Sequence, residues 1–186
     1  MIFVALLRGI NVGGNNKVDM KKLKLTFEGI GLADVVTYIN TGNIIFRDDS
    51  RTAQEIIVKL EEAIAADFGL TIRVMVRTFN EIKSIMNKVP EHWTNGTDMK
   101  SDIMYLWDEI DDESVLEKLT INPEVDRVSY VPGAVLWSYD RVDADKSGMN
   151  KMTTSKKIFQ QMTVRNVNTA RKIYELMQAA EQKALK

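Results

Sequence analysis

The sequence predicts an α+β protein whose N-terminal part is ferredoxin-like, with a split βαβ order and an antiparallel sheet. Apolar runs typical of strands alternate with amphipathic helical segments, and residues 1–78 follow the order strand, helix, strand, strand, helix, strand. Residues 79–186 repeat the first five elements and end in a long helix. We therefore expect a ferredoxin-like subdomain at 1–78 and a second α+β subdomain at 79–186, which element order suggests is an incomplete duplication.

The first strand and helix have clear boundary signals. Residues 2–7 are continuously apolar, which is typical of a buried strand. Asp19 has the side chain of a helix N-cap, and Val18 and Leu23 are placed for a hydrophobic staple. Apolar residues then recur at helical spacing as far as Ile30, and Gly29 and Gly31 both offer a C-terminal stop for the helix.

A hairpin and a second helix follow. The segments 35–39 and 43–46 are β-rich and flank an Asn-Thr-Gly turn, which predicts a hairpin. Thr52 and Glu55 have the spacing of a capping box, so a helix should begin there. The segment 71–76 completes the set as a fourth strand.

The second part begins with another helix signal. Thr78 and Glu81 have capping-box spacing, which predicts a helix near 79–88. Residues 89–101 are rich in turn formers and are the candidate junction between subdomains. The other predicted elements are strands at 102–107, 126–131 and 134–139, a helix at 111–119, a short helix near 155–162 and a final helix from about residue 169.

Composition narrows the function classes. The net charge is −1 and the pI is about 5.9, so a broad basic surface for nucleic acid is not expected. The absence of cysteine excludes disulfides, thiolate catalysis and cysteine metal sites. No apolar run approaches the roughly 18 residues of a membrane span, and the N-terminus lacks the pattern of a signal peptide. We expect a cytoplasmic protein with no membrane partner, no metal and no cofactor.

Several segments resemble reactive sites without matching them. Residues 143–154 begin like a calcium-binding EF-hand loop, but Thr154 stands where a bidentate glutamate is needed. His92 is the single histidine and has no obvious partner, so it is interpreted as a surface or packing residue. The acidic stretch 108–119 is interpreted as a charged turn leading into a helix, and the lysines at 21–22 as a solvated helix face.

The candidate site is the turn that follows the first strand. Its glycines allow positive φ and close approach of a ligand to backbone N–H groups, its cations can pair with an anion, and its asparagines can orient polar groups. The spacing matches neither a Walker A loop nor the dinucleotide-binding pattern, and Asp19 would occupy the position that an anion prefers. A purely structural turn remains the alternative interpretation. The candidate ligand-binding residues of the turn are Arg8, Gly9, Asn11, Gly13, Gly14, Asn15 and Lys17.

Arg165 is the candidate from the second part. It stands just before the final helix, where Asn166 or Asn168 would be the N-cap, so its guanidinium could help to bind an anion. If Arg165 and Arg8 faced one cleft, that cleft would be the site. The sequence leaves this point open.

Three segments resemble a known family. "LLRGINVGGNNKVDM", "TYINTGNIIF" and "TVRNVNTARKI" are similar to the motifs of the bacterial family called domain of unknown function 1697. Thr41 and Val167 stand where that family commonly has serine and tryptophan. The resemblance implies a ferredoxin-like N-terminal part with a second subdomain, and it implies no reaction.

Three function hypotheses follow from these observations. The chain could bind a small anionic or phosphorylated ligand at the glycine-rich turn, with catalysis left open because no general base stands out. It could bind RNA through Phe3 and Phe46 on the central strands, although strands that are apolar on both faces are typical of covered ones. It could be an interaction protein without a small ligand, and the oligomeric state is left unassigned.

Overall fold

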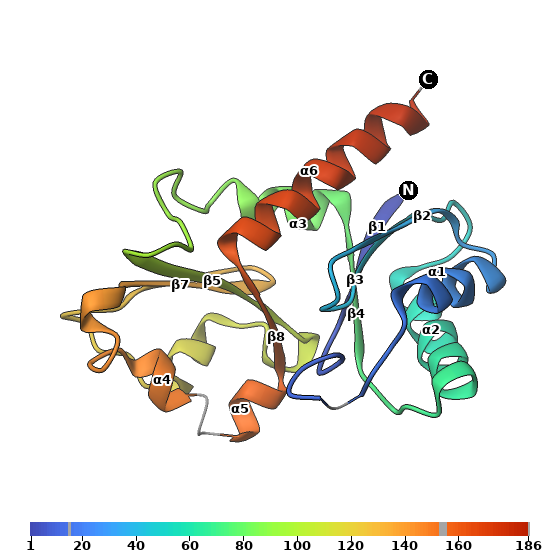
Figure 1. Ribbon diagram of the computed structural model, residues 1–186. Helices are drawn as coiled ribbons and strands as arrows, with labels where there is room; N and C mark the ends of the chain where they lie inside the picture. The colour runs from blue at the N-terminus through green and yellow to red at the C-terminus, as the bar shows by residue number, and fades with distance from the viewer. Residues whose placement is uncertain (15, 153–155, 186) are drawn as a thin grey trace. The chain divides into compact units, whose positions relative to one another are not determined.

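The computed structural model describes residues 1–14, 16–152 and 156–185 (Figure 1). The chain divides into two compact units, Met1–Ile82 with Ile173–Lys186, and Lys83–Lys172. The sequence predicted two subdomains, 1–78 and 79–186, and whether these two segments fold independently stays a prediction. The helices and strands of Met1–Ile82 are β1 (Ile2–Leu7), α1 (Met20–Gly29), β2 (Ala33–Tyr38), β3 (Asn43–Arg47), α2 (Ala53–Phe68), β4 (Val74–Thr78) and the start of α3 (Phe79–Met86).

The first unit has the predicted ferredoxin-like order of elements. Its four strands lie in the order β2-β3-β1-β4, and every neighbouring pair is antiparallel. The Asp19 carboxylate accepts a hydrogen bond from Lys22 N at 2.7 Å, which confirms it as the N-cap of α1. Thr52 and Glu55 form the predicted capping box of α2.

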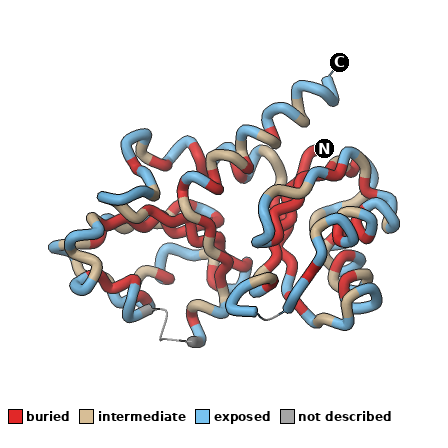
Figure 2. Tube along the Cα trace, in the orientation of Figure 1, coloured by how far each residue is buried: buried red, intermediate tan, exposed pale blue. Residues whose placement is uncertain are grey.

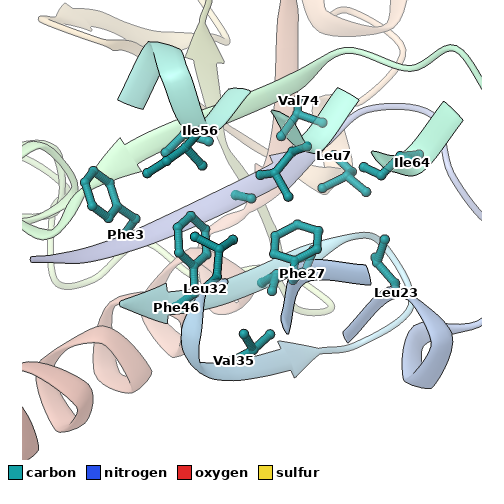
Figure 3. Packing of buried hydrophobic residues seen from close by; sticks show 14 of the residues in the cluster. Phe3, Leu7, Leu23, Phe27, Leu32, Val35, Phe46, Ile56, Ile64 and Val74 are labelled. Atoms are coloured by element: carbon teal, nitrogen blue, oxygen red, sulfur yellow. The ribbon is translucent and has the colours of Figure 1, made fainter. Parts of the chain in front are cut away.

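The core of the first unit lies between this sheet and helices α1 and α2 (Figure 3). Phe3 and Phe46 stack with ring centroids 5.7 Å apart, and Phe27 meets Phe46 edge-on at 5.8 Å. All six residues of β1 are buried, on both faces of the sheet (Figure 2). This burial explains why the strand is continuously apolar instead of alternating.

The β2–β3 turn depends on Gly42. Its φ is +77°, and a Cβ there would lie 2.7 Å from Leu7 Cβ and 2.9 Å from Ile10 Cδ1. The buried Asn43 side chain donates to Tyr38 O at 3.0 Å and to Thr41 Oγ1 at 3.1 Å. These contacts support a role of the Asn-Thr-Gly segment in shaping the hairpin.

The second unit also holds a four-stranded antiparallel sheet, in the order β6-β7-β5-β8. The sequence predicted no strand before the last helix, yet β8 supplies the fourth strand there, so the duplication of strand order is complete. The predicted helix at 111–119 is a short 3₁₀ turn, which the Asp112 carboxylate caps by accepting from Ser114 N at 2.9 Å. The remaining elements are β5 (Met99–Leu106), the 3₁₀ turns η1 (Asp108–Ile110), η2 (Glu113–Lys118) and η3 (Arg141–Asp143), β6 (Arg127–Val131), β7 (Ala134–Asp140), α4 (Gly148–Met152), α5 (Lys156–Gln160), β8 (Met162–Asn166) and α6 (Val167–Ala184), whose C-terminal part from Ile173 belongs to the first unit.

The repeat extends to strand register. In the first sheet Val4 pairs with Ile45 and Arg77 on its two sides, and in the second sheet Ile103 pairs in the same way with Leu136 and Arg165. An arginine therefore occupies the same position in both edge strands.

The turns and helix starts around these strands repeat as well. Leu7 N donates to Gly42 O at 2.8 Å, and Leu106 N donates to Gly133 O at 2.9 Å. Both glycines have positive φ. Each edge strand then leads directly into a helix, capped by Thr78 before α3 and by Asn166 before α6. The duplication is thus evident in corresponding hydrogen bonds, even where the residues that form them differ, as Thr78 and Asn166 do.

A buried carboxylate holds the second unit together. Asp126 Oδ1 accepts from Trp137 Nε1 at 3.0 Å and from Ser147 Oγ at 2.5 Å. Its Oδ2 accepts from Asn122 N and from Gly148 N, both at 2.8 Å. Asp126 thus joins the segment before β6, strand β7 and the start of α4.

Asp48 plays a comparable part in the first unit and should make its stability depend on pH. Burial acts to raise the pKa of Asp48, but hydrogen bonds from the N–H groups of Ser50 and Arg51, the Ser50 hydroxyl and the Arg51 guanidinium outweigh it and lower the pKa to about 2. Since this carboxyl has an ordinary pKa of 3.8 when unfolded, its stabilisation is complete above that value and is lost as pH falls toward 2.

We expect the Asp48 contribution to be roughly 2 kcal/mol at neutral pH. Urea unfolding followed by far-ultraviolet circular dichroism between pH 2 and 6 measures it, with Asp48→Asn as the comparison. The wild-type chain should lose more stability than the variant between pH 4 and 2. Equal losses in the two proteins would contradict this assignment.

Candidate functional site

The glycine-rich turn is built from residues with left-handed backbone. Gly9, Gly13 and Gly14 have φ values of +74°, +59° and +81°, and Asn11 has +53°. A Cβ built at any of the three glycines would meet no atom within 4 Å, so the glycines are required by conformation and leave open space beside the backbone. Asn15 lies outside the described residues.

Asn11 closes the turn with its side chain. Its amide nitrogen donates to Val18 O at 3.0 Å and to Asn40 O at 2.9 Å, and its amide oxygen accepts from Val18 N at 2.8 Å. Asn16 adds a further bond by donating to Gly9 O at 2.9 Å. The Asn11 amide therefore has both donors engaged in shaping the loop, which supports the structural role of this residue beside any role toward a ligand.

A groove opens between this turn and the start of α1. Its volume is about 790 Å³, which lies within the usual range for small-molecule sites. Of the candidate residues in the turn, Asn11, Gly14 and Lys17 line it, while Arg8, Gly9 and Gly13 do not. The lining residues are Asn11, Gly14, Lys17, Val18, Asp19, Met20, Lys21 and Asn40.

Among the lining residues that were not predicted as ligand-binding, Lys21 and Asn40 add polar side chains to the groove. Lys21, interpreted above as part of a solvated face, is exposed but borders the groove together with Lys17. Asn40 comes from the β2–β3 turn and is joined to the glycine-rich turn by the Asn11 side chain. The groove thus combines residues 11–21 with Asn40, which lies farther along the chain. No local sequence pattern predicts that these two segments meet.

Arg8 is a half-buried cation near a second arginine. Burial, and then the positive charge of Arg73, lower the pKa of the Arg8 guanidinium. Arg8 N also donates to Arg73 O at 3.4 Å. Arg73 was not among the residues predicted from the sequence, where its only signal is a charged residue directly before an apolar strand.

Arg165 lies in β8 of the second unit and is 7% exposed. Its guanidinium donates to Thr163 Oγ1 at 3.0 Å and to Val164 O at 2.9 Å. Burial lowers the pKa of Arg165 to about 10, against the opposing influence of Tyr105. As predicted, the residue stands just before a helix start, and Asn166 is the N-cap because its side chain accepts from Thr169 N at 2.9 Å. A shared site with Arg8 stays a prediction.

The segment that resembles a calcium loop is used for internal contacts. Ser147 is buried against Asp126, and the Asp143 carboxylate pairs with Lys146 at 2.8 Å. Thr154 lies outside the described residues. Within the described ranges, no group of three or more histidine or acidic side chains is placed to hold a metal ion.

Two further findings bear on the function classes. Phe3 and Phe46 are 2% and 0% exposed, so in this structure their rings are not available to stack on RNA bases. Among the described helices, none combines the length and the apolar character needed to cross a bilayer.

The glycine-rich turn and the hairpin fall within a region that matches a family model. Residues 1–137 match the model described as "Protein of unknown function (DUF1697)". The chain belongs to the DUF1697 family. This DUF1697 chain is also similar to a solved structure, that of the conserved bacterial protein SP0830 from Streptococcus pneumoniae. The match has a TM-score of 0.81 and 24% identity, and it covers 95% of this chain and 98% of the other. At that identity the likeness concerns the fold. No curated protein matches the chain.

Proposed function

We propose that this DUF1697 protein binds a small anionic or phosphorylated ligand in the groove beside the glycine-rich turn. The observation that carries the proposal is the pair of lysines, Lys17 and Lys21, that line the groove where helix α1 begins. The positive end of the helix dipole favours an anion at the same place. The open space beside Gly14 would let a ligand approach the backbone closely.

Asp19 is the feature that opposes an anion. Its carboxylate lines the groove but is engaged with Lys22 N at 2.7 Å as the N-cap. The described lining contains two ammonium groups and this single carboxylate, so its charge favours an anion. No acidic side chain stands in the first turn of α1 to add to Asp19.

The proposal is for binding, and it assigns no reaction. Asp19 is the one carboxylate of the described lining, and its capping bond holds it in a structural role. A catalytic base would have to come from outside the described lining of the groove, so the proposed function includes no catalysis. We place this activity in the cytoplasm, consistent with a cysteine-free chain.

Calorimetric titration tests the proposal with ribose 5-phosphate, mononucleotides and inorganic phosphate at low and moderate salt. We expect saturable binding that the double variant Lys17→Ala/Lys21→Ala weakens roughly a hundredfold, because each of the two lost charge-assisted contacts costs about 1.5 kcal/mol. The control is Lys59→Ala, which removes an exposed lysine of α2 outside the groove. Equal affinity in the double variant and the control would contradict the assignment of the groove.

A further inference from the structure

The loop before β5 contains the chain's one Asn-Gly pair, Asn95-Gly96. An asparagine followed by glycine is prone to lose its side-chain amide, because glycine has no Cβ to hinder the attack of its backbone nitrogen on the asparagine side chain. Gly96 is exposed, Asn95 is half-buried, and a Cβ at Gly96 would meet no atom within 4 Å. The pair is therefore open to water, which the reaction consumes.

The reaction of such a pair proceeds through a cyclic imide. The Gly96 nitrogen loses its proton and attacks Asn95 Cγ, so a new bond forms between these two atoms. The bond from Cγ to Nδ2 then breaks, and the side-chain nitrogen leaves as ammonia with the proton that Gly96 lost. Water opens the imide and leaves aspartate or isoaspartate at position 95. The step needs no oxidant, reductant or cofactor.

Both oxygens that gain negative charge in this reaction already accept hydrogen bonds. Loss of the Gly96 proton spreads charge onto Asn95 O, because the peptide bond is conjugated, and this oxygen accepts from Asn168 Nδ2 at 3.0 Å. Attack on Cγ places charge on Asn95 Oδ1, which accepts from Arg141 Nη2 at 3.4 Å. Donors that point at the atoms where charge develops lower the barrier of acyl transfer.

Arg141 is an exposed residue that the loop holds in place. Its Nε donates to Gly96 O at 2.6 Å, and its backbone N–H donates to Asp98 O at 2.8 Å. A guanidinium stays cationic in proteins. Its bond to Asn95 Oδ1 is long in the resting state and should shorten as that oxygen becomes negative.

The hydrogen bond from Gly96 N to Met99 O, at 3.0 Å, opposes the reaction. The Gly96 nitrogen can lose its proton only while this bond is open. Exposed loops with few buried apolar contacts open at a low cost in free energy. We therefore expect the bond to make the reaction slow without preventing it.

We propose that Asn95 is a site of self-catalysed deamidation. Arg141 stabilises the negative charge on Asn95 Oδ1, and Asn168 polarises the peptide group that loses its proton. The carboxylate of the product lies beside the Arg141 guanidinium and pairs with it. The modification thus adds a negative charge to this loop, and it is one-way because the ammonia is lost. This site lies in the second unit and does not rest on the proposed groove.

Mass spectrometry of the full chain, incubated in its folded state and then digested with trypsin, tests the proposal. Cleavage after Lys88 and Lys100 releases the peptide 89–100, in which Asn95 is the only asparagine. This peptide should gain the mass that replaces NH₂ by OH and should take up heavy oxygen from labelled water. The rate should rise with pH, because the Gly96 amide must lose its proton. Gly96→Ala should slow the change strongly, since a Cβ hinders ring closure.

The role of Arg141 has its own test. Arg141→Gln should slow deamidation roughly tenfold, because a charge-assisted contact to the developing charge is lost. Arg127→Gln, which removes an exposed arginine of the same unit that pairs with Asp140, should leave the rate unchanged. Hydrogen exchange of the Gly96 amide in each variant shows how often this N–H is released, so the rates are compared per opening. Absence of deamidation in the wild type, or an equal or faster rate per opening in Arg141→Gln, would overturn the proposal.

Discussion

Replacing Gly148 by alanine should destabilise the second unit by more than about 3 kcal/mol, the upper part of the range for overpacking. A Cβ at this position would lie 1.7 Å from Thr120 O and 2.6 Å from Thr120 C. These are backbone atoms, which cannot move aside as the end of a flexible side chain can. Any shift of residue 148 would also displace its N–H from Asp126 Oδ2.

Tryptophan fluorescence during urea unfolding measures this effect in the relevant unit. Trp93, Trp107 and Trp137 all lie within Lys83–Lys172, so their emission reports on the second unit. The matched control is Gly96→Ala in the same unit, because a Cβ there meets no atom within 4 Å and its φ is not positive. We expect the control to change stability by no more than about 0.5 kcal/mol. If Gly148→Ala were as stable as this control, the backbone at Thr120 or residue 148 could shift at little cost, and the prediction would be wrong.

Replacing Asp126 by asparagine should cost about 3 kcal/mol or more. The two oxygens of Asp126 accept from four donors, and the residue is 7% exposed. Asparagine retains one oxygen and presents an NH₂ group to donors that then have no acceptor. Leaving buried N–H groups without an acceptor lowers the free energy of unfolding. Disrupting a network with a charged acceptor lowers it more than removing one neutral hydrogen bond does.

The pH dependence gives a second readout of the Asp126 network. Burial acts to raise the pKa of Asp126, but its hydrogen bonds, led by that from Ser147, outweigh burial and lower the pKa. The stabilisation should therefore be complete above the ordinary value of 3.8 and decrease as pH falls below it. Asp140→Asn is the control, since Asp140 forms an exposed pair with Arg127, and exposed ion pairs contribute little to stability. A cost of Asp126→Asn no larger than that of Asp140→Asn would contradict the structural role of the network.

Local signals in the sequence predicted the first unit well. The N-cap at Asp19, the capping box of Thr52 with Glu55 and the turn at Gly42 act within a few residues of each element, so they can be identified without knowing the partners. They place the helices and the hairpin, and the apolar run at 2–7 then has to be a central strand.

The fold of the second unit was harder to predict at its last strand. The strand β8 is short and contains Arg165, whose charge interrupts the apolar pattern. It is defined by pairing with β5, where Arg165 lies opposite Ile103, and that pairing is distant in sequence. Its buried arginine bonds to its own strand through Thr163 and Val164, an arrangement that composition does not indicate.

The residues that line the candidate groove were predicted only in part, because local patterns do not show which distant residues meet. Gly14 and Lys17 were found because they belong to one unusual segment. Lys21 was assigned to a solvated face because lysine pairs on helices commonly are solvated. Asn40 was missed because its place beside the turn depends on a hydrogen bond between residues 29 positions apart. Short motifs thus reveal the segment that forms a site more readily than the residues that complete it.

The measurement that tests the proposed anion groove most directly is amide nuclear magnetic resonance of the full chain during titration with ribose 5-phosphate. The proposal predicts saturable shifts concentrated at Gly14, Lys17, Lys21 and Asn40, with loss of saturation in Lys17→Ala/Lys21→Ala. Shifts that are absent, or that lie away from these residues and persist in the double variant, would contradict the proposal and leave the glycines with the single role of turning the chain.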